Sequence, residues 1–183
     1  MERAVAVKIM QKHITKKNLQ KHCLAVEAVM EKLAEHLGED KYRWAMVGLL
    51  HDIDYEETID DSARHGIVGA EMLADMGFPI EIAQAVAAHN SMHGMEKKKL
   101  IDKALYAADP LTGLIVAGAL IKPEKKLSAI DVDFLLNRFN EKSFARGANR
   151  KQVAACVEFG LSLEEFMGIG LSAMQGISKE LGL

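Results

Sequence analysis

The chain has 183 residues, of which 49% are hydrophobic and 27% are charged, and its formal net charge is -3. This balance is typical of a globular protein and gives no general electrostatic attraction to nucleic acid or to an anionic membrane. The length suits one domain with a substantial core, and two cysteines are too few for a disulfide scaffold. The N-terminus lacks the long apolar core of a signal peptide. We therefore expect a cytoplasmic protein, with neither a nucleic-acid polymer nor a membrane as a partner.

Helices should account for the whole fold, because residues of high helix propensity are abundant and alternating strand patterns are few. Apolar spacing predicts helices over about residues 2–13, 18–37, 40–51, 62–76, 80–89, 99–108, 128–140, 150–159 and 163–181. Asn18, Ser62 and either Ser128 or Asp131 are expected N-caps, and Gly38 is an expected stop. Pro110 should kink or restart a helix that continues to residue 121. No linker or repeat divides the chain, so residues 1–183 should form one all-α domain.

Four of the predicted helical segments carry a histidine on the apolar face or at the end of an apolar run. His22 lies on the apolar stripe of the helix over 18–37, and His51 ends the apolar run at residues 47–50. His65 and His89 lie on the apolar faces of the next two predicted helices. Each histidine alone has an ordinary explanation, as a hydrogen-bonded core residue or as a complement to the dipole at a helix C-terminus.

Two carboxylates are placed where burial would be costly. Asp52 follows His51 directly, and Asp109 lies on the apolar face of the helix that starts near residue 99. A buried carboxylate without a partner is strongly destabilising unless its pKa rises until it is neutral. Gly66 and Gly69, which weaken a helix, suggest a close helix approach or a ligand that needs room.

The combination of these residues is more informative than any one of them. Four buried histidines and two buried acids without a shared partner would be destabilising, and one or two cations would offset that cost. Imidazole and carboxylate ligands suit Fe, Mn, Zn, Co or Ni, so we expect one or two divalent transition-metal ions as cofactors. The candidate metal ligands are His22, His51, Asp52, His65, His89 and Asp109.

The order of these residues resembles the signature of the HD superfamily of metal-dependent phosphohydrolases, over about residues 17–120. Within it, the additional histidines at positions 65 and 89 resemble the HDIG-type subgroup. The resemblance implies an HD-type helical bundle with a core over about 17–121 and C-terminal helices, within 122–183, packed on it. It also implies one metal at His22, His51, Asp52 and Asp109, and a second that Asp52 shares with His65 and His89.

The resemblance further implies hydrolysis of a small phosphorylated substrate, such as a nucleotide, by a metal-activated water. The candidate catalytic residues are Asp52, Asp54 and Lys103. Asp52 would bridge the two metals, Asp54 would position the water or relay its proton, and Lys103 would contact the substrate phosphate. A solvated acid in an acidic loop explains Asp54 equally well, and a surface lysine is the better explanation of Lys103.

Departures from the family pattern narrow the activity. Asp54 stands where the HDIG form has glycine, Asn90 stands where a second histidine would follow His89, and there is no Gly-Tyr-Pro element. These differences disfavour a cyclic-di-nucleotide phosphodiesterase, and the absence of a Glu-Asp pair after the His-Asp pair disfavours an alarmone hydrolase. Two alternatives to a phosphohydrolase stay open: an HD-fold di-iron oxygenase with the same ligands, and a metal-binding or ligand-sensing module with little catalysis.

Overall fold

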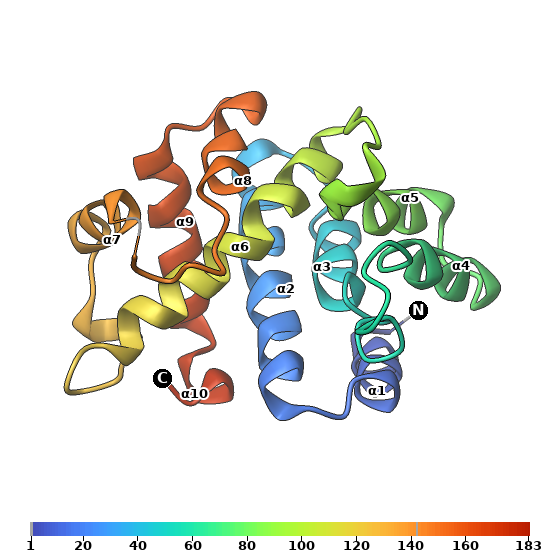
Figure 1. The fold of residues 1–183 in the computed structure, drawn as a ribbon, viewed down its shortest axis with the longest axis horizontal. Coiled ribbons are helices and arrows are strands. Elements are labelled where there is room, and N and C mark those ends of the chain that lie inside the picture. The colour runs from blue at the N-terminus through green and yellow to red at the C-terminus, as the bar shows by residue number, and fades with distance from the viewer. Residues whose placement is uncertain (1, 142) are drawn as a thin grey trace.

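Helices joined by turns make up the computed structural model, which describes residues 2–141 and 143–183 (Figure 1). The α-helices are α1 (Arg3–His13), α2 (Lys17–Leu37), α3 (Lys41–Leu50), α4 (Ile67–Asp75), α5 (Ile80–His89), α6 (Leu100–Leu120), α7 (Val132–Asn140), α8 (Arg150–Ala154), α9 (Leu163–Gly176) and α10 (Ser178–Leu181). Short 3-10 helices are η1 (Ser91–His93), η2 (Leu127–Ala129) and η3 (Ala155–Phe159). No strand occurs in the described ranges, so the all-α prediction is confirmed. Within the same ranges, no helix combines the length and apolar character that crossing a membrane requires.

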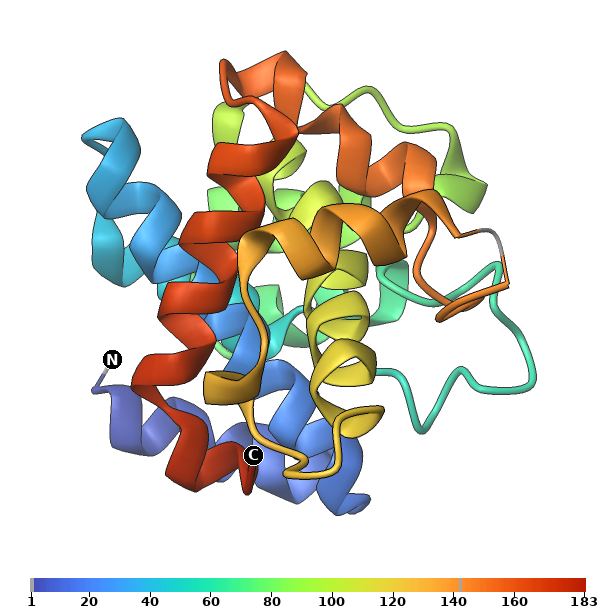
Figure 2. The same cartoon turned by 90° about the vertical axis from the view of Figure 1, so that its left-hand side faces the viewer.

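The long helix α2 lies at the centre of the molecule and contacts α3, α6 and α9. In Figure 1, α1, α3, α4 and α5 lie on one side of α2, and α7, α8 and α9 lie on the other, with α6 running across both. The turned view shows α7 and α9 packed over α6 (Figure 2). One cluster of buried apolar side chains extends from Ala6 in α1 to Leu181 in α10.

A close approach of α2 and α3 positions the ends of both helices. Gly48 of α3 faces the backbone of α2, and a Cβ atom at Gly48 would lie 2.7 Å from the carbonyl oxygen of Val26. Glycine is required at this position because a contact with backbone cannot be relieved by rotating a side chain. As a result, His51 and Asp52 at the end of α3 lie beside His22 on α2.

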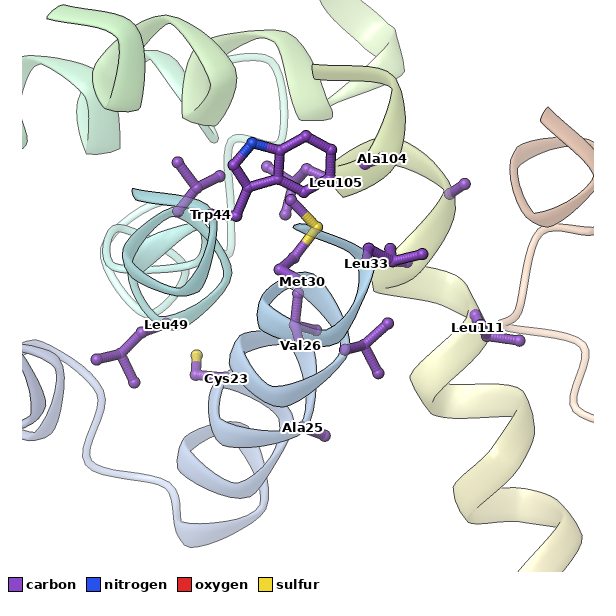
Figure 3. Packing of buried hydrophobic residues seen from close by; sticks show 14 of the residues in the cluster. Cys23, Ala25, Val26, Met30, Leu33, Trp44, Leu49, Ala104, Leu105 and Leu111 are labelled. Carbon is purple, nitrogen blue, oxygen red and sulfur yellow. The ribbon is translucent and has the colours of Figure 1, made fainter. Parts of the chain in front are cut away.

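The core between α2, α3 and α6 is built from large apolar side chains (Figure 3). Val26, Met30 and Leu33 form the apolar stripe of α2 and are fully buried. Trp44 of α3 and Leu105 of α6 pack on the same stripe. Burying a side chain of this kind contributes about 1.5–3 kcal/mol, so apolar packing stabilises the contacts among these three helices.

Helix α6 runs unbroken through Pro110, so of the two effects expected of this proline, a kink or a restart, the restart is wrong. Proline removes one backbone hydrogen bond, but Pro110, Leu111 and Thr112 are all buried against neighbouring helices. Helix α9 approaches so closely here that a Cβ atom at Gly170 would lie 2.7 Å from Cδ2 of Leu111. This packing favours a continuous helix over a break at the proline, and Asp109 therefore lies inside α6.

The start of α2 differs from the prediction because a distant side chain takes the place of the expected cap. Asn18 lies inside the helix, and no side chain of α2 caps its first turn. Instead, the Glu56 carboxylate accepts hydrogen bonds from the backbone amides of Thr15 and Lys16, at 2.9 and 2.8 Å. The predicted stop is confirmed, since Gly38 adopts a left-handed conformation with a φ of 73°.

Helix α4 begins later than predicted, and Ser62 is not its cap. The chain before it forms turns, and Gly66 has a φ of 87°, which only glycine adopts readily. The carboxylate of Asp54 accepts hydrogen bonds from the backbone amides of Gly66 and Gly69, at 2.7 and 2.9 Å. Asp54 therefore acts as the cap of α4 although it precedes the helix by more than ten residues.

Candidate metal centre

The six candidate ligands meet at one place, although they come from α2, α6, the ends of α3 and α5, and the turn before α4. Asp52 lies at the centre of the cluster. Its Oδ1 atom is 3.4 Å from Nε2 of His51, 3.3 Å from Nε2 of His65 and 3.6 Å from Nε2 of His89. Its Oδ2 atom is 3.7 Å from Nε2 of His22. The carboxylate of Asp52 thus faces the Nε2 atoms of four histidines.

Asp109 completes the cluster from α6. Its Oδ1 atom lies 3.1 Å from Nε2 of His22 and 3.9 Å from Nε2 of His51. Two groups of ligand atoms, each within 4.8 Å of one another, could hold a metal ion: His22, His51 and Asp52 form one group, and Asp52, His65 and His89 form the other. Because Asp52 belongs to both groups, it could be shared by two ions.

The orientations of His51 and His89 are set by the helices that they end. Nδ1 of His51 donates to the carbonyl oxygen of Gly48 at 2.8 Å, and Nδ1 of His89 donates to that of Val86 at 2.6 Å. A carbonyl oxygen can only accept, so in each neutral ring Nδ1 carries the hydrogen and Nε2 keeps its lone pair. Contacts of this kind fix the tautomer and direction of metal-binding histidines.

A threonine holds His22 in the same way. The hydroxyl of Thr112 donates to the carbonyl oxygen of Asp109 at 2.8 Å, so it accepts from Nδ1 of His22, 3.2 Å away. Thr112 is 1% exposed, which protects this contact from competing water. Nε2 of His22 is therefore left free to face Asp52 and Asp109.

Asp54 holds His65, which lies in a turn rather than in the predicted helix. The buried Asp54 carboxylate lies 3.0 Å from Nδ1 of His65 and also binds the amides of the following segment. A Cβ atom at Gly69 would lie 3.0 Å from Oδ1 of Asp54, so this glycine provides the close approach expected from its position. Asp54 thus orients a candidate ligand, and its role in relaying a proton stays a prediction.

One buried ring nitrogen of the cluster fits a bound cation. Nε2 of His51 is buried without a hydrogen-bond partner in the described part of the chain, whereas Nε2 of His65 and Nε2 of His89 lie 3.1 Å apart and share a hydrogen bond. A buried polar atom without a partner costs free energy, which a metal ion would recover. Imidazole nitrogens combined with carboxylates form a donor set for divalent transition metals. The residues present therefore fit a centre for one or two such ions.

The family model described as HD domain matches residues 19–117, a range that contains all six candidate ligands. The chain belongs to the HD domain family. Proteins of this family are typically metal-dependent phosphohydrolases, and the His-Asp cluster described above fits metal binding.

Curated proteins similar to this HD domain are matched over very different shares of their own length. Ribonuclease Y of Desulfotalea psychrophila is 28% identical over 136 residues, which are 73% of this chain and 26% of that protein. Ribonuclease Y of Oleidesulfovibrio alaskensis is 31% identical over 96 residues, 52% of this chain and 18% of that protein. The chain thus spans only 18 to 26% of these two relatives. Uncharacterized protein MJ0778 of Methanocaldococcus jannaschii is 31% identical over 142 residues, 72% of this chain and 80% of that protein.

Burial and charge act in opposite directions on the ionisable groups of the HD centre. Burial lowers the pKa of His65, but its hydrogen bonds to Asp52 and Asp54 outweigh burial and raise this pKa to about 10. Burial would raise the pKa of Asp52, yet the neighbouring histidines, His51 first among them, hold it well below its usual range. At His51 burial dominates and lowers the pKa. At pH 7 Asp52 is therefore an anion and His51 a neutral ring, which are the forms that bind a metal, whereas His65 is protonated and would release a proton when a metal binds.

Three residues that sequence reasoning did not assign to the HD centre support it: Thr112, Asn90 and His93. Nδ2 of Asn90 donates to the carbonyl oxygens of Ser62 and His65 at 2.9 and 3.0 Å, and Nε2 of His93 donates to that of His65 at 2.7 Å. Asn90 and His93 thus fix the turn that carries His65. In the sequence, the position of Asn90 and His93 just after the buried His89 could have indicated their role. For Thr112, the corresponding signal was its spacing of three residues from Asp109.

Proposed function

We propose that the protein is a metal-dependent hydrolase of a small phosphate ester, such as a nucleotide. The observation that carries this proposal is the convergence of four histidine Nε2 atoms on the carboxylate of Asp52, with Asp109 beside them. A divalent ion held by such residues polarises a phosphoryl oxygen and makes water a stronger nucleophile at neutral pH. Membership of the HD domain family supports the same class of reaction.

The substrate would reach the centre from one side only. The side chains of Asp109, His22 and His65 are 32%, 24% and 16% exposed, whereas those of His51 and His89 are 0% and 4% exposed. The phosphate would therefore lie over the face formed by Asp109, His22 and His65, and the deeper histidines would not contact it.

In this proposal the chain's own residues position the reacting groups. Asp52 holds the two ligand groups together, because its two oxygens face different histidines. Asp54 and Thr112 keep the rings of His65 and His22 turned toward the centre. Lys103 is partly exposed on α6, about 120° around the helix from Asp109, and it is the proposed contact to a substrate phosphate.

The decisive experiment combines metal analysis with an activity screen. Protein purified without added metals is analysed by mass spectrometry of the elements, and the Mn- or Co-loaded protein is tested without O₂ on phosphomonoesters, phosphodiesters and nucleotides. Short oligoribonucleotides belong in the same screen, because two similar proteins are named ribonuclease Y. Turnover that is lost in Asp52→Ala supports the proposal. Ferrous-dependent O₂ consumption would show an oxygenase instead, and neither activity would show a binding or sensing module.

A further inference from the structure

A pocket of about 510 Å³ lies beside the HD centre and takes no part in the chemistry described so far. It is formed between the start of α2 and the turns that follow α3. Its lining residues are Lys16, Lys17, Asn18, Leu19, Tyr55 and Ile59. One wall is therefore apolar and aromatic, and the other is polar and basic.

Two residues connect this pocket, hereafter the Tyr55 pocket, to the HD centre. The ring of Tyr55 packs edge-on against the ring of His65, with centroids 5.6 Å apart. Leu19 lies three residues before His22 on α2, so both side chains lie on the same face of the helix. His22 and His65 are also the more exposed histidines of the centre. A phosphate bound at the centre would therefore carry its alcohol group toward the Tyr55 pocket.

The apolar wall is held rigidly in place. Thr58 is buried, and its hydroxyl donates to the carbonyl oxygen of Asp54 at 2.9 Å. The Glu56 carboxylate accepts from the hydroxyl of Thr15 at 2.7 Å and so ties the turn to the start of α2. Ile59 follows Thr58 in this turn and is 52% exposed. A preformed apolar surface inside a pocket is suited to an apolar or aromatic part of a ligand.

The polar wall offers groups that are free to bind a ligand. Within the described ranges, the hydroxyl of Tyr55 and the side-chain amide of Asn18 have no hydrogen-bond partner. In the part of the chain that the structure describes, Lys17 donates only to Oε1 of Gln20, its neighbour one helical turn away, at 3.2 Å. If a ring of the ligand packs against Tyr55 and Ile59, these polar groups can form hydrogen bonds with donors and acceptors on the edge of that ring.

We infer that the Tyr55 pocket binds the alcohol part of the substrate and selects a planar ring that carries hydrogen-bonding groups. Tyr55 and Ile59 are then specificity-determining residues that contact the ring, and Asn18 contacts its polar edge. This inference rests on the proposed function, because it places the phosphate of the same molecule at the HD centre.

The test compares two phosphate esters of primary alcohols, a nucleoside 5′-monophosphate and glycerol 3-phosphate. Their leaving groups are chemically similar, so a difference in kcat/KM reports the part of the molecule outside the phosphate. Ile59→Ser should lower kcat/KM for the nucleotide about ten-fold, mainly through KM, because an apolar contact in a pocket contributes roughly that much. The same variant should leave the value for glycerol 3-phosphate and the metal content unchanged.

Ile80→Ser is the matched control, because Ile80 is also an exposed isoleucine, with 64% of its surface exposed. It is the first residue of α5, whereas His89 is the last. The Ile80→Ser variant should leave both substrates unaffected. An equal loss for both substrates in Ile59→Ser, or no loss for the nucleotide, would overturn the inference.

Failure of the proposed function can be told apart from failure of the pocket. If the metal-loaded wild type hydrolyses neither ester, calorimetric titration with the same two compounds tests the pocket alone. Tighter binding of the nucleotide than of glycerol 3-phosphate, reduced by Ile59→Ser and kept in Ile80→Ser, would support the pocket. Equal affinity of the wild type for both compounds would refute it.

Discussion

Replacing Thr112 by valine tests whether the contacts around the histidines tune metal binding. Valine keeps the size and branching of threonine but removes the oxygen that accepts from Nδ1 of His22. The ring of His22 would then lose the contact that fixes its tautomer and direction. The carbonyl oxygen of Asp109, which also loses the hydroxyl, keeps its regular hydrogen bond within α6. The perturbation therefore acts on one histidine.

The size of the effect follows from the geometry. Removing the outer partner of a metal-binding histidine costs about 10–100-fold in metal affinity. The bond between His22 and Thr112 is 3.2 Å, at the long end for a nitrogen donor, so we expect the lower limit. A ten-fold loss corresponds to about 1.4 kcal/mol. Thr112→Ser, which keeps the hydroxyl, should restore most of this affinity.

The assay is a competition titration with a metal chelator, performed on wild type, Thr112→Val and Thr112→Ser. Urea unfolding of the metal-free proteins measures the cost to the fold separately. Equal metal affinity in Thr112→Val and wild type would refute the role assigned to Thr112. A loss that Thr112→Ser does not restore would show a packing effect in place of the hydrogen bond.

Four further substitutions test other parts of the structure. Asp52→Ala should remove metal and activity together because Asp52 belongs to both ligand groups, and full metal content on elemental analysis would contradict this. His89→Ala should lose one ion and keep the other, so an unchanged metal count would indicate a mononuclear centre. Gly48→Ala should destabilise the protein by about 1–3 kcal/mol in urea unfolding, because its Cβ atom would meet the backbone of α2. Arg3→Met removes the partner of the buried Glu27 carboxylate, bound at 2.6 and 2.7 Å. Burial already raises the pKa of Glu27 and Arg3 opposes that rise. In the variant this pKa should rise further, so stability should be lost as the pH increases through it, and unfolding should show a larger loss at about pH 7 than at about pH 4. An equal loss at both values would exclude an ionised Glu27 as the cause.

Most helices of the fold were predictable from the local spacing of apolar residues. The apolar stripe of α2 at Val26, Met30 and Leu33 is visible in the sequence and is the buried face in the structure. The stop at Gly38 and the cap at Asp131, which accepts from the amide of Phe134, were also predictable, because each depends on residues within one turn. Asn18 was misjudged because a carboxylate from another segment binds at the start of α2, and the restart at Pro110 was wrong because packing keeps α6 continuous.

The sequence by itself determined that this protein is all-helical and which histidines and acids are its candidate metal ligands. Both conclusions depend on the chemistry and the order of residues along the chain, which can be read without knowing which segments meet in space. The family resemblance implied that Asp52 is shared by these ligands, but only the tertiary structure decided that Nδ1 of each histidine is bound outward and Nε2 points inward to Asp52. It also assigned Asp54 to His65 and formed the pocket at Tyr55. These features join residues that are distant in the sequence, and the close approach of helices at Gly48 makes them possible, which no local pattern specifies.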